Sequence, residues 1–273
     1  MNPTNKLILV LSDGLRYDTA VSSMGFMWHM VESGRASLYK VISQVPSFSR
    51  PMYETIHTGL TPLEHGIVSN YVVRRSNQPN VFDTAVKAGR TTAAAAYSWF
   101  SELYNRAPYD LIADREVDDV SLLIQHGRFY SQDEFPDVEL FATAASLVRR
   151  FAPDYLLVHP MGMDYAGLKH GYDSSEYRYA AIRQDVVLAN LIVEWMGLGY
   201  KIIVTADHGI NKDGYHGGST PDEREVALFL IEPGVPGKGD TMEVVSQLRI
   251  APTLCRLLDI PAPASMTQSP ITE

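Results

Sequence analysis

Cysteine is almost absent from this sequence. The 273 residues contain one, Cys255, so no disulfide can form within the chain. Cys255 lies in an apolar helical pattern and is interpreted as a small buried hydrophobe. Long apolar runs are also lacking: the run at 6–12 is too short to span a membrane, has no small-residue cleavage site and leads into Asp13. We therefore expect a cytoplasmic protein without a membrane segment, whose first strand is this run.

Basic side chains are scarce. Lysine and arginine number 23 against 32 aspartates and glutamates, a formal net charge of −9. A protein that coats nucleic acid needs a basic face, so that class is excluded. An acidic protein can still bind a phosphorylated small molecule if metal ions supply positive charge locally. The expected partner is a small phosphorylated substrate such as a nucleotide, and the oligomeric state stays open.

The order of the predicted elements indicates an α/β fold. Strands alternate with helices, which favours a mostly parallel sheet with helices on both faces, a three-layer arrangement. We expect one catalytic domain over residues 1–273. Short apolar runs predict strands at 6–12, 36–45, 91–97, 154–159, 201–206 and 226–231, and helical spacing predicts helices at 17–34, 51–59, 81–88, 133–151, 174–196 and 242–258.

Two segments are predicted less regularly. Residues 61–80 are expected to form a loop, and the region at about 97–135 is rich in aromatic side chains. Two interpretations of the second region stay open: an inserted cap over the site, or a loop packed by its own aromatic rings.

Residues suited to metal chemistry follow several of the predicted strands. The carboxyl ends of the strands are where ligands bind in open α/β sheets. Each residue alone has a plain explanation as part of a turn or loop, but their joint placement indicates a site. Carboxylates together with imidazoles suit zinc or manganese. The candidates in chain order are Asp13, Ser49, Asp164, Asp207, His208 and His216.

The stretch at 46–70, PSFSRPMYETIHTGLTPLEHGIVSN, is the centre of this pattern. Pro51 is suited to the first turn of a helix, and Ser49 precedes it. Free backbone N–H groups at a helix start attract anions. Ser49 is therefore either a helix cap or a nucleophile directed at a phosphate-like group.

This stretch resembles the nucleophile segment of the alkaline phosphatase superfamily, and most closely that of the nucleotide pyrophosphatase/phosphodiesterase branch. The Asp-Gly at 13–14, the Thr-Ala-Asp-His-Gly at 205–209 and the His-Gly-Gly at 216–218 are similar to the metal motifs of that superfamily. The resemblance covers most of the chain and implies an alkaline-phosphatase-like fold.

The resemblance also implies a reaction. A two-metal hydrolase would cleave phosphodiester or pyrophosphate bonds through a phosphoryl-serine intermediate on Ser49. Zinc is the expected metal and manganese the alternative. By the resemblance, one ion is bound by Asp13, Ser49, Asp207 and His208, and the other by Asp164 and His216. Asn70 matches a residue that donates to a phosphoryl oxygen, and the predicted substrate-binding residues are Arg50, Asn70 and Tyr165.

Two positions depart from the pattern of the branch. Arg50 follows the nucleophile where nucleotide-hydrolysing members usually have an aromatic residue, which puts nucleotide specificity in doubt. Leu168 stands where a metal-binding histidine is expected. His170, between Gly167 and Gly171, is predicted to replace it, because a glycine-flanked loop could let the backbone adapt.

Two alternatives follow from these departures. If Arg50 contacts the phosphate, a phosphonate or phosphomonoester hydrolase of the same superfamily is favoured, although Arg50 is also interpretable as a solvated residue at a helix start. If Leu168 leaves one metal site incomplete, the chain is a degenerate, metal-poor phosphate-binding protein.

Overall fold

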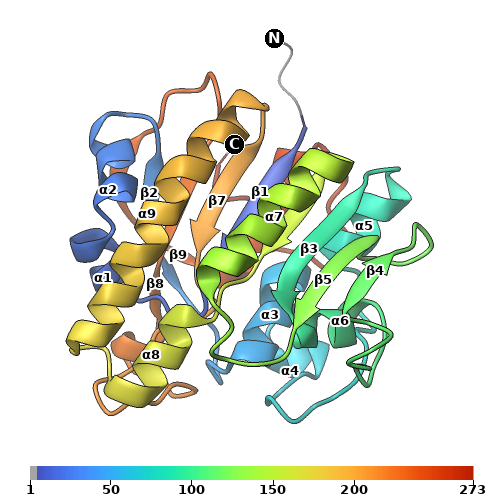
Figure 1. Cartoon of the computed structure of the whole chain (residues 1–273), viewed down its shortest axis with the longest axis horizontal. Helices are drawn as coiled ribbons and strands as arrows, with labels where there is room; N and C mark the ends of the chain where they lie inside the picture. The colour runs from blue at the N-terminus through green and yellow to red at the C-terminus, as the bar shows by residue number, and fades with distance from the viewer. Residues whose placement is uncertain (1–4, 273) are drawn as a thin grey trace.

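A nine-stranded sheet forms the centre of the computed structural model, which describes residues 5–272 (Figure 1). The strands are β1 (Leu7–Leu11), β2 (Ser37–Ile42), β3 (Thr92–Tyr97), β4 (Glu116–Asp118), β5 (His126–Tyr130), β6 (Tyr155–Val158), β7 (Lys201–Thr205), β8 (Glu225–Ile231) and β9 (Gly239–Ser246). Their order is β4-β5-β3-β6-β1-β7-β8-β2-β9. Pairing is parallel from β5 to β7 and between β2 and β9, and antiparallel at β4–β5, β7–β8 and β8–β2. The predicted mostly parallel α/β fold is confirmed.

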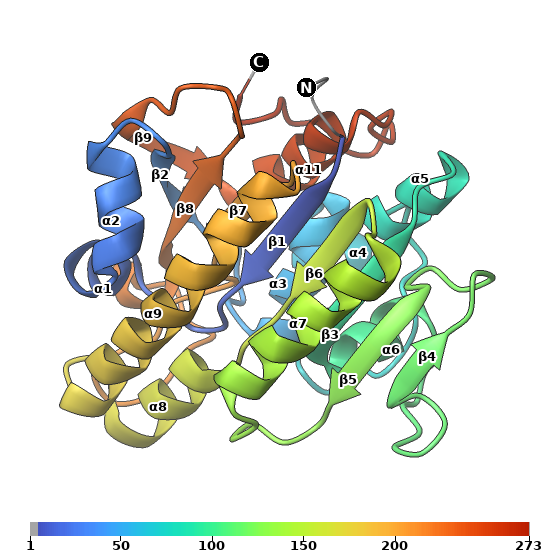
Figure 2. The same ribbon diagram turned by 45° about the horizontal axis from the view of Figure 1, so that its top comes forward.

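Helices cover both faces of the sheet (Figures 1 and 2). On one face lie α1 (Tyr17–Ser23), α2 (Gly25–Glu32), α7 (Asp137–Phe151) and α9 (Ser175–Gly197). On the other lie α3 (Ser49–Thr58), α5 (Val81–Lys87), α6 (Ser98–Tyr104) and α11 (Ile250–Leu258). The remaining helical segments are α4 (Pro62–His65), α8 (Gly162–His170), α10 (Pro221–Arg224) and a 3-10 turn at Gln247–Arg249. Within residues 5–272, no helix is long and apolar enough to cross a bilayer.

β1 lies in the middle of the sheet and is fully enclosed. All five of its side chains are buried, as expected for a strand covered on both faces. Parallel pairing with β6 and β7 places the carboxyl ends of these three strands at one edge of the sheet. β2 points the same way, because two antiparallel steps through β8 separate it from β7. The residues that follow these strands therefore meet at that edge.

Several element predictions were wrong in detail, including the loop predicted at 61–80, which contains helix α4. The helix predicted at 17–34 divides at Met24, where the Asp185 carboxylate accepts hydrogen bonds from the backbone N–H groups of Phe26 and Met27 and so caps α2. The helix predicted at 242–258 loses its first residues to the edge strand β9, which pairs with β2. The glycine-flanked loop predicted at His170 lies at the end of helix α8.

The region at 97–135 contributes to the sheet itself. β5 pairs with β3, and β4 pairs with β5, so these two strands extend the sheet at one edge. α6 follows β3 without a break and packs beside α3. This segment therefore supplies one wall next to the start of α3.

Candidate active site

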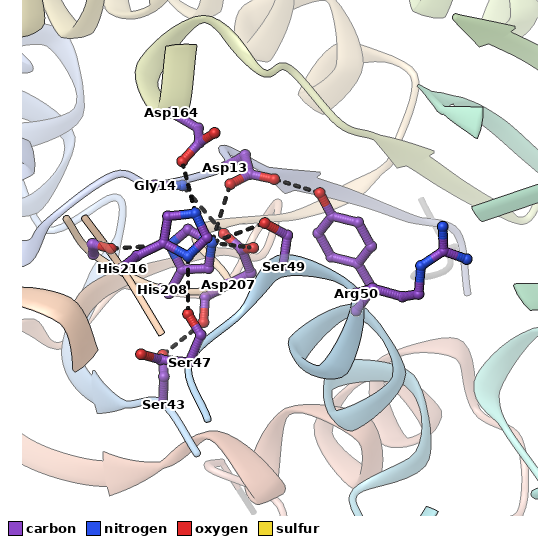
Figure 3. Close-up of polar contacts among 12 residues, drawn as sticks. Asp13, Gly14, Ser43, Ser47, Ser49, Arg50, Asp164, Asp207, His208 and His216 are labelled. Carbon is purple, nitrogen blue, oxygen red and sulfur yellow. Dashed lines mark hydrogen bonds and ion pairs between the residues drawn. The ribbon is translucent and has the colours of Figure 1, made fainter. Parts of the chain in front are cut away.

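Five segments of the chain bring polar side chains together at the carboxyl edge of the sheet (Figure 3). Asp13 follows β1, Ser49 begins α3 after β2, and Asp164 lies in α8 after β6. Asp207 and His208 follow β7, and His216 comes from the loop behind them. The structure thus brings together the candidates that the sequence placed at strand ends.

Ser49 is the first residue of α3, not its cap. Phe48 occupies the cap position and makes no side-chain cap bond. Ser49 is 4% exposed, and its Oγ lies 3.0 Å from Nε2 of His208. His208 Nδ1 lies 2.9 Å from the carbonyl oxygen of Gly209. A proton on Nδ1 for that bond leaves the Nε2 lone pair facing Ser49, the form that accepts a proton or binds a metal.

The acidic and histidine side chains form two groups that share His208. One group is Asp13, Asp207 and His208, and the other is Asp164, His208 and His216; within each, the ligand-type atoms lie within 4.8 Å of one another. His208 Nε2 is 3.4 Å from Asp13 Oδ1 and 3.2 Å from Asp207 Oδ2. The rings of His208 and His216 stack with centroids 4.0 Å apart.

Burial sets the charge states in these groups. It raises the pKa of Asp164 and of Asp207 well above the usual value, and the nearby charge of Asp13 adds to the rise. Burial opposes ionisation of Asp13 too, but hydrogen bonding from His159 and the nearby imidazoles hold its pKa at about 2. Burial and the neighbouring His216 lower the pKa of His208 to about 3, so this imidazole is neutral.

The side chains fit a divalent cation. Asp13 Oδ1, Asp164 Oδ1 and Asp207 Oδ2 are buried and accept no hydrogen bond from the described residues. Packing three carboxyl groups together without such partners costs free energy. A divalent ion in each group would offset that cost, and carboxylates with neutral imidazoles are ligands for zinc or manganese.

Asn70 is held near the nucleophile by a hydrogen bond to the backbone of the next residue, Arg50. Its Oδ1 accepts a hydrogen bond from the backbone N–H of Arg50 at 3.0 Å. This bond fixes the amide and leaves the two Nδ2 hydrogens for another acceptor. The geometry suits a donor to a substrate oxygen near Ser49.

Arg50 is buried, so its interpretation as a solvated residue was wrong. It is 1% exposed, and its guanidinium pairs with Glu102 of α6 at 2.7 Å. The same group stacks on the ring of Trp99, 4.4 Å from the centroid. Figure 3 shows the side chain extending away from the acidic cluster. Its charge is therefore already paired with that of Glu102.

His170 lies outside both groups of potential ligands. It is exposed at the end of α8, six residues after Asp164, and therefore on a different side of a helix with about 3.6 residues per turn. The premise of a flexible glycine-flanked loop was wrong. Leu168, four residues after Asp164, is on the same side as that carboxylate. The structure therefore gives no support to His170 as a replacement ligand.

Tyr165 is half-buried in α8, and its hydroxyl accepts a hydrogen bond from Lys169. With His170 it lines a groove of about 490 Å³ between α7, α8 and α9. Its predicted role in substrate binding stays a prediction.

Two residues near the site were missed in the sequence. Tyr53 of α3 and His159, just after β6, both contact the carboxylate of Asp13. His159 ends a predicted strand, as other candidates do, and this was the available signal. Tyr53 is one helical turn after Ser49, but only the fold shows that it reaches Asp13.

Comparisons with known proteins identify relatives of this sequence. Residues 7–214 match the family described as type I phosphodiesterase / nucleotide pyrophosphatase. GPI ethanolamine phosphate transferase 2 of Candida albicans is 27% identical over 95% of this chain, and the catalytic subunit of GPI ethanolamine phosphate transferase 3 of Mus musculus is 25% identical over 98%. The matches cover only 30% and 26% of those two proteins.

Solved structures share the fold. Murine ectonucleotide pyrophosphatase/phosphodiesterase 5 superposes with a TM-score of 0.74 at 14% identity, covering 94% of this chain and 96% of that one. A wild-type alkaline phosphatase gives a TM-score of 0.73 at 12% identity, covering 100% and 99%. The family match over most of the chain and the shared alkaline-phosphatase-like fold lead to one conclusion: the chain belongs to the type I phosphodiesterase / nucleotide pyrophosphatase family.

Proposed function

We propose that this chain cleaves phosphodiester bonds, with pyrophosphate bonds as a related substrate class, and that Ser49 is the nucleophile. One observation carries the proposal: the Ser49 hydroxyl lies 3.0 Å from Nε2 of His208, beside three buried carboxyl groups with unpaired oxygens. Two divalent ions, zinc first and manganese as the alternative, suit Asp13, Ser49, Asp207 and His208 on one side and Asp164 and His216 on the other. Such ions would lower the pKa of the Ser49 hydroxyl and neutralise the charge that builds on the phosphoryl oxygens.

The side chains of the chain have separate roles in this reaction. Ser49 attacks phosphorus, a bond forms between Oγ and phosphorus, and the bond to the leaving alcohol breaks. The start of α3 favours the anionic group through the positive end of its helix dipole, while the backbone N–H of Arg50 is already bonded to Asn70 and Pro51 has none. Asn70 donates from Nδ2 to a non-bridging oxygen. Water then attacks phosphorus, the bond between phosphorus and Oγ breaks, and Ser49 regains its proton.

The surroundings of Arg50 favour a diester over a monoester. A monoester carries one more negative charge, which an additional free cation near Ser49 would stabilise. The charge of Arg50 is already neutralised by Glu102. Arg50 also stands where nucleotide-hydrolysing relatives usually present a flat ring, so this position offers no ring to a base. We therefore infer a diester whose leaving group is not restricted to a nucleoside.

A second candidate is transfer of the phosphoryl group to an alcohol. The observation in its favour is that relatives matching 95% or more of this chain are named ethanolamine phosphate transferases. Both reactions use the same serine intermediate and differ in whether water or an alcohol removes the group. In the transfer version, phosphoethanolamine is the group carried by Ser49.

Turnover of chromogenic substrates tests the proposal. We expect the metal-loaded protein to cleave bis(p-nitrophenyl) phosphate much faster than p-nitrophenyl phosphate. Faster turnover of the monoester would favour the phosphomonoesterase alternative. No turnover of either, with metal bound, would favour a phosphate-binding protein. Adding ethanolamine or another primary alcohol and analysing the products by mass spectrometry distinguishes transfer from hydrolysis.

The Ser49→Ala variant should lose turnover and remain folded, because the lost hydrogen bond contributes only about 1 kcal/mol. A matched control is Ser101→Ala, which removes a buried hydroxyl in α6 that has no hydrogen-bond partner among the described residues. The control should keep full activity. A Ser49→Ala protein with a few per cent of parental activity would refute the nucleophile assignment.

A further inference from the structure

Asp13 is held by two side chains that have no part in the proposed reaction. The hydroxyl of Tyr53 donates to Oδ2 of Asp13, and Nε2 of His159 lies 3.2 Å from the same oxygen. All three residues are completely buried. Both donors therefore use one carboxylate oxygen. The other, Oδ1, has no hydrogen-bond donor and faces His208 at 3.4 Å.

Each donor is itself fixed by its neighbours. The ring of Tyr53 stacks on Phe100 at 4.4 Å between centroids, and the ring of His159 packs edge-on against Tyr53 at 4.8 Å. The backbone N–H of His159 donates to Ala95 at 2.9 Å, and its carbonyl accepts from the Tyr130 hydroxyl at 2.6 Å. Asp13 is thus held between α3 and the end of β6, and neither donor can turn away without disturbing packed rings.

We propose that Tyr53 and His159 are positioning residues that orient Asp13, so that only Oδ1 is presented to a metal ion, and thereby set the affinity of that site. The inference rests on the proposed metal-dependent function. Its physical basis is that partners of a ligating side chain fix its direction before the ion arrives, and their loss typically weakens metal binding by about 10- to 100-fold. Tyr53 has a second consequence: it lies one turn after Ser49 on α3, so the same helix places both the nucleophile and the donor that orients Asp13.

The Tyr53→Phe variant isolates the hydroxyl from the packing of the ring. Tyr104→Phe is the matched control, since Tyr104 is also a completely buried tyrosine next to α3, and its hydroxyl donates to Glu54 at 3.0 Å instead. Zinc and manganese dissociation constants would be measured by competition with a chelating dye. The metal-free proteins would be compared by circular dichroism and thermal unfolding.

We expect Tyr53→Phe to weaken binding of one ion about 10- to 100-fold, with the second ion less affected and the Tyr104→Phe values unchanged. His159 gives an independent test if Tyr53→Phe does not fold. His159→Phe should weaken the same ion, and His159→Gln, which keeps an N–H donor, should recover part of the affinity. A purely structural role would change stability and leave the dissociation constants alone.

Parental dissociation constants in folded Tyr53→Phe and His159→Phe would overturn the inference, as would equal weakening in Tyr104→Phe. The outcome is separable from that of the proposed function. If the parent binds no zinc or manganese, the metal-dependent function itself fails. If the parent binds metal and turns over substrate while these variants keep its affinity, only the positioning role fails.

Discussion

Asn70 is bound to the main chain next to the nucleophile and not to the nucleophile itself. Because its Oδ1 accepts from the backbone of Arg50, substituting Asn70 should not move Ser49 far. We expect Asn70→Ala to lower the chemical step about 100-fold, the scale for loss of one preorganised donor to an oxyanion. Single-turnover kinetics would measure this step. Metal content should stay parental, and a variant that loses metal would place Asn70 in a structural role.

Glu54 should make stability depend on pH. It is buried in α3, where its carboxyl contacts the hydroxyls of Ser76 and Tyr104, and burial raises its pKa to about 7. The folded state therefore holds a proton that the unfolded state releases near pH 4.5. Its contribution is fully present below that pH and is lost as the pH rises to about 7, on the order of 3 kcal/mol in total.

The Glu54→Gln variant should remove this loss. We expect its free energy of unfolding, from urea titrations, to fall less between pH 5 and pH 8 than that of the parent. The parent and the variant must be compared, because other groups change the stability in the opposite sense over this pH range. Burial lowers the pKa of His57 and of His65 to about 4, so these residues add stability as the pH rises from about 4 towards 6.5. Identical pH profiles for parent and variant would show that Glu54 is ionised in the fold.

The role of a single residue could be predicted from the sequence only where it did not depend on a partner from a distant segment. Asp13, Asp207 and His208 are recognisable because each follows a short apolar run, and strand direction alone brings them to one edge. Arg50 was not interpretable in this way. Its partner Glu102 is remote in sequence and comes from a region whose structure the sequence left open. Tyr53 and His159 were missed for the same reason.

At the scale of elements, the geometry of α8 determines which side chains can join Asp164 in the second group of potential ligands. Asp164 and Leu168 are four residues apart and share a side of the helix, while the exposed His170 does not. We therefore expect His170→Ala to leave metal binding and turnover unchanged. Leu168→His should add a ligand beside Asp164 and tighten binding of one ion. Metal titration of both variants tests this, and loss of one ion in His170→Ala would restore the replacement hypothesis.

α8 also shows why some elements escaped prediction. Gly162, Gly167 and Gly171 made the segment resemble a loop, since glycine is unfavourable in helices. The structure uses Gly167 for close packing: a Cβ there would lie 2.7 Å from Cδ1 of Ile210, in the chain that leads to His216. Tertiary contact thus outweighed propensity. The long amphipathic helices α7 and α9, whose packing faces are evident from spacing, were predicted to within a few residues.

For the whole molecule, removal of metal should lower stability more at high pH than at low pH. Burial raises the pKa of Asp164 and Asp207, so without metal their contribution is complete below about pH 4 and is lost as the pH rises. Bound cations reverse this by favouring the ionised carboxylates. At metal concentrations 100-fold above the dissociation constant, each ion adds about 2.7 kcal/mol.

Thermal unfolding with and without a chelator measures this effect. We expect the fall in melting temperature on chelation to be larger at pH 8 than at pH 5. The Ser101→Ala variant should behave like the parent, because Ser101 contacts neither group of potential ligands. Equal falls at both values of pH would mean that the two carboxyl groups are already ionised in the metal-free fold.

The position of β1 in the middle of the sheet has a consequence for how the chain is made. Leu7 pairs with Tyr155 on one side and with Lys201 on the other, so a ribosome must synthesise most of this sequence before β1 has both neighbours. β2 gains its neighbours even later in synthesis, because its partners β8 and β9 lie beyond residue 214, where the family match ends. Such distant pairings slow folding and leave apolar strands exposed during translation, which is when chaperones would have their greatest effect on yield.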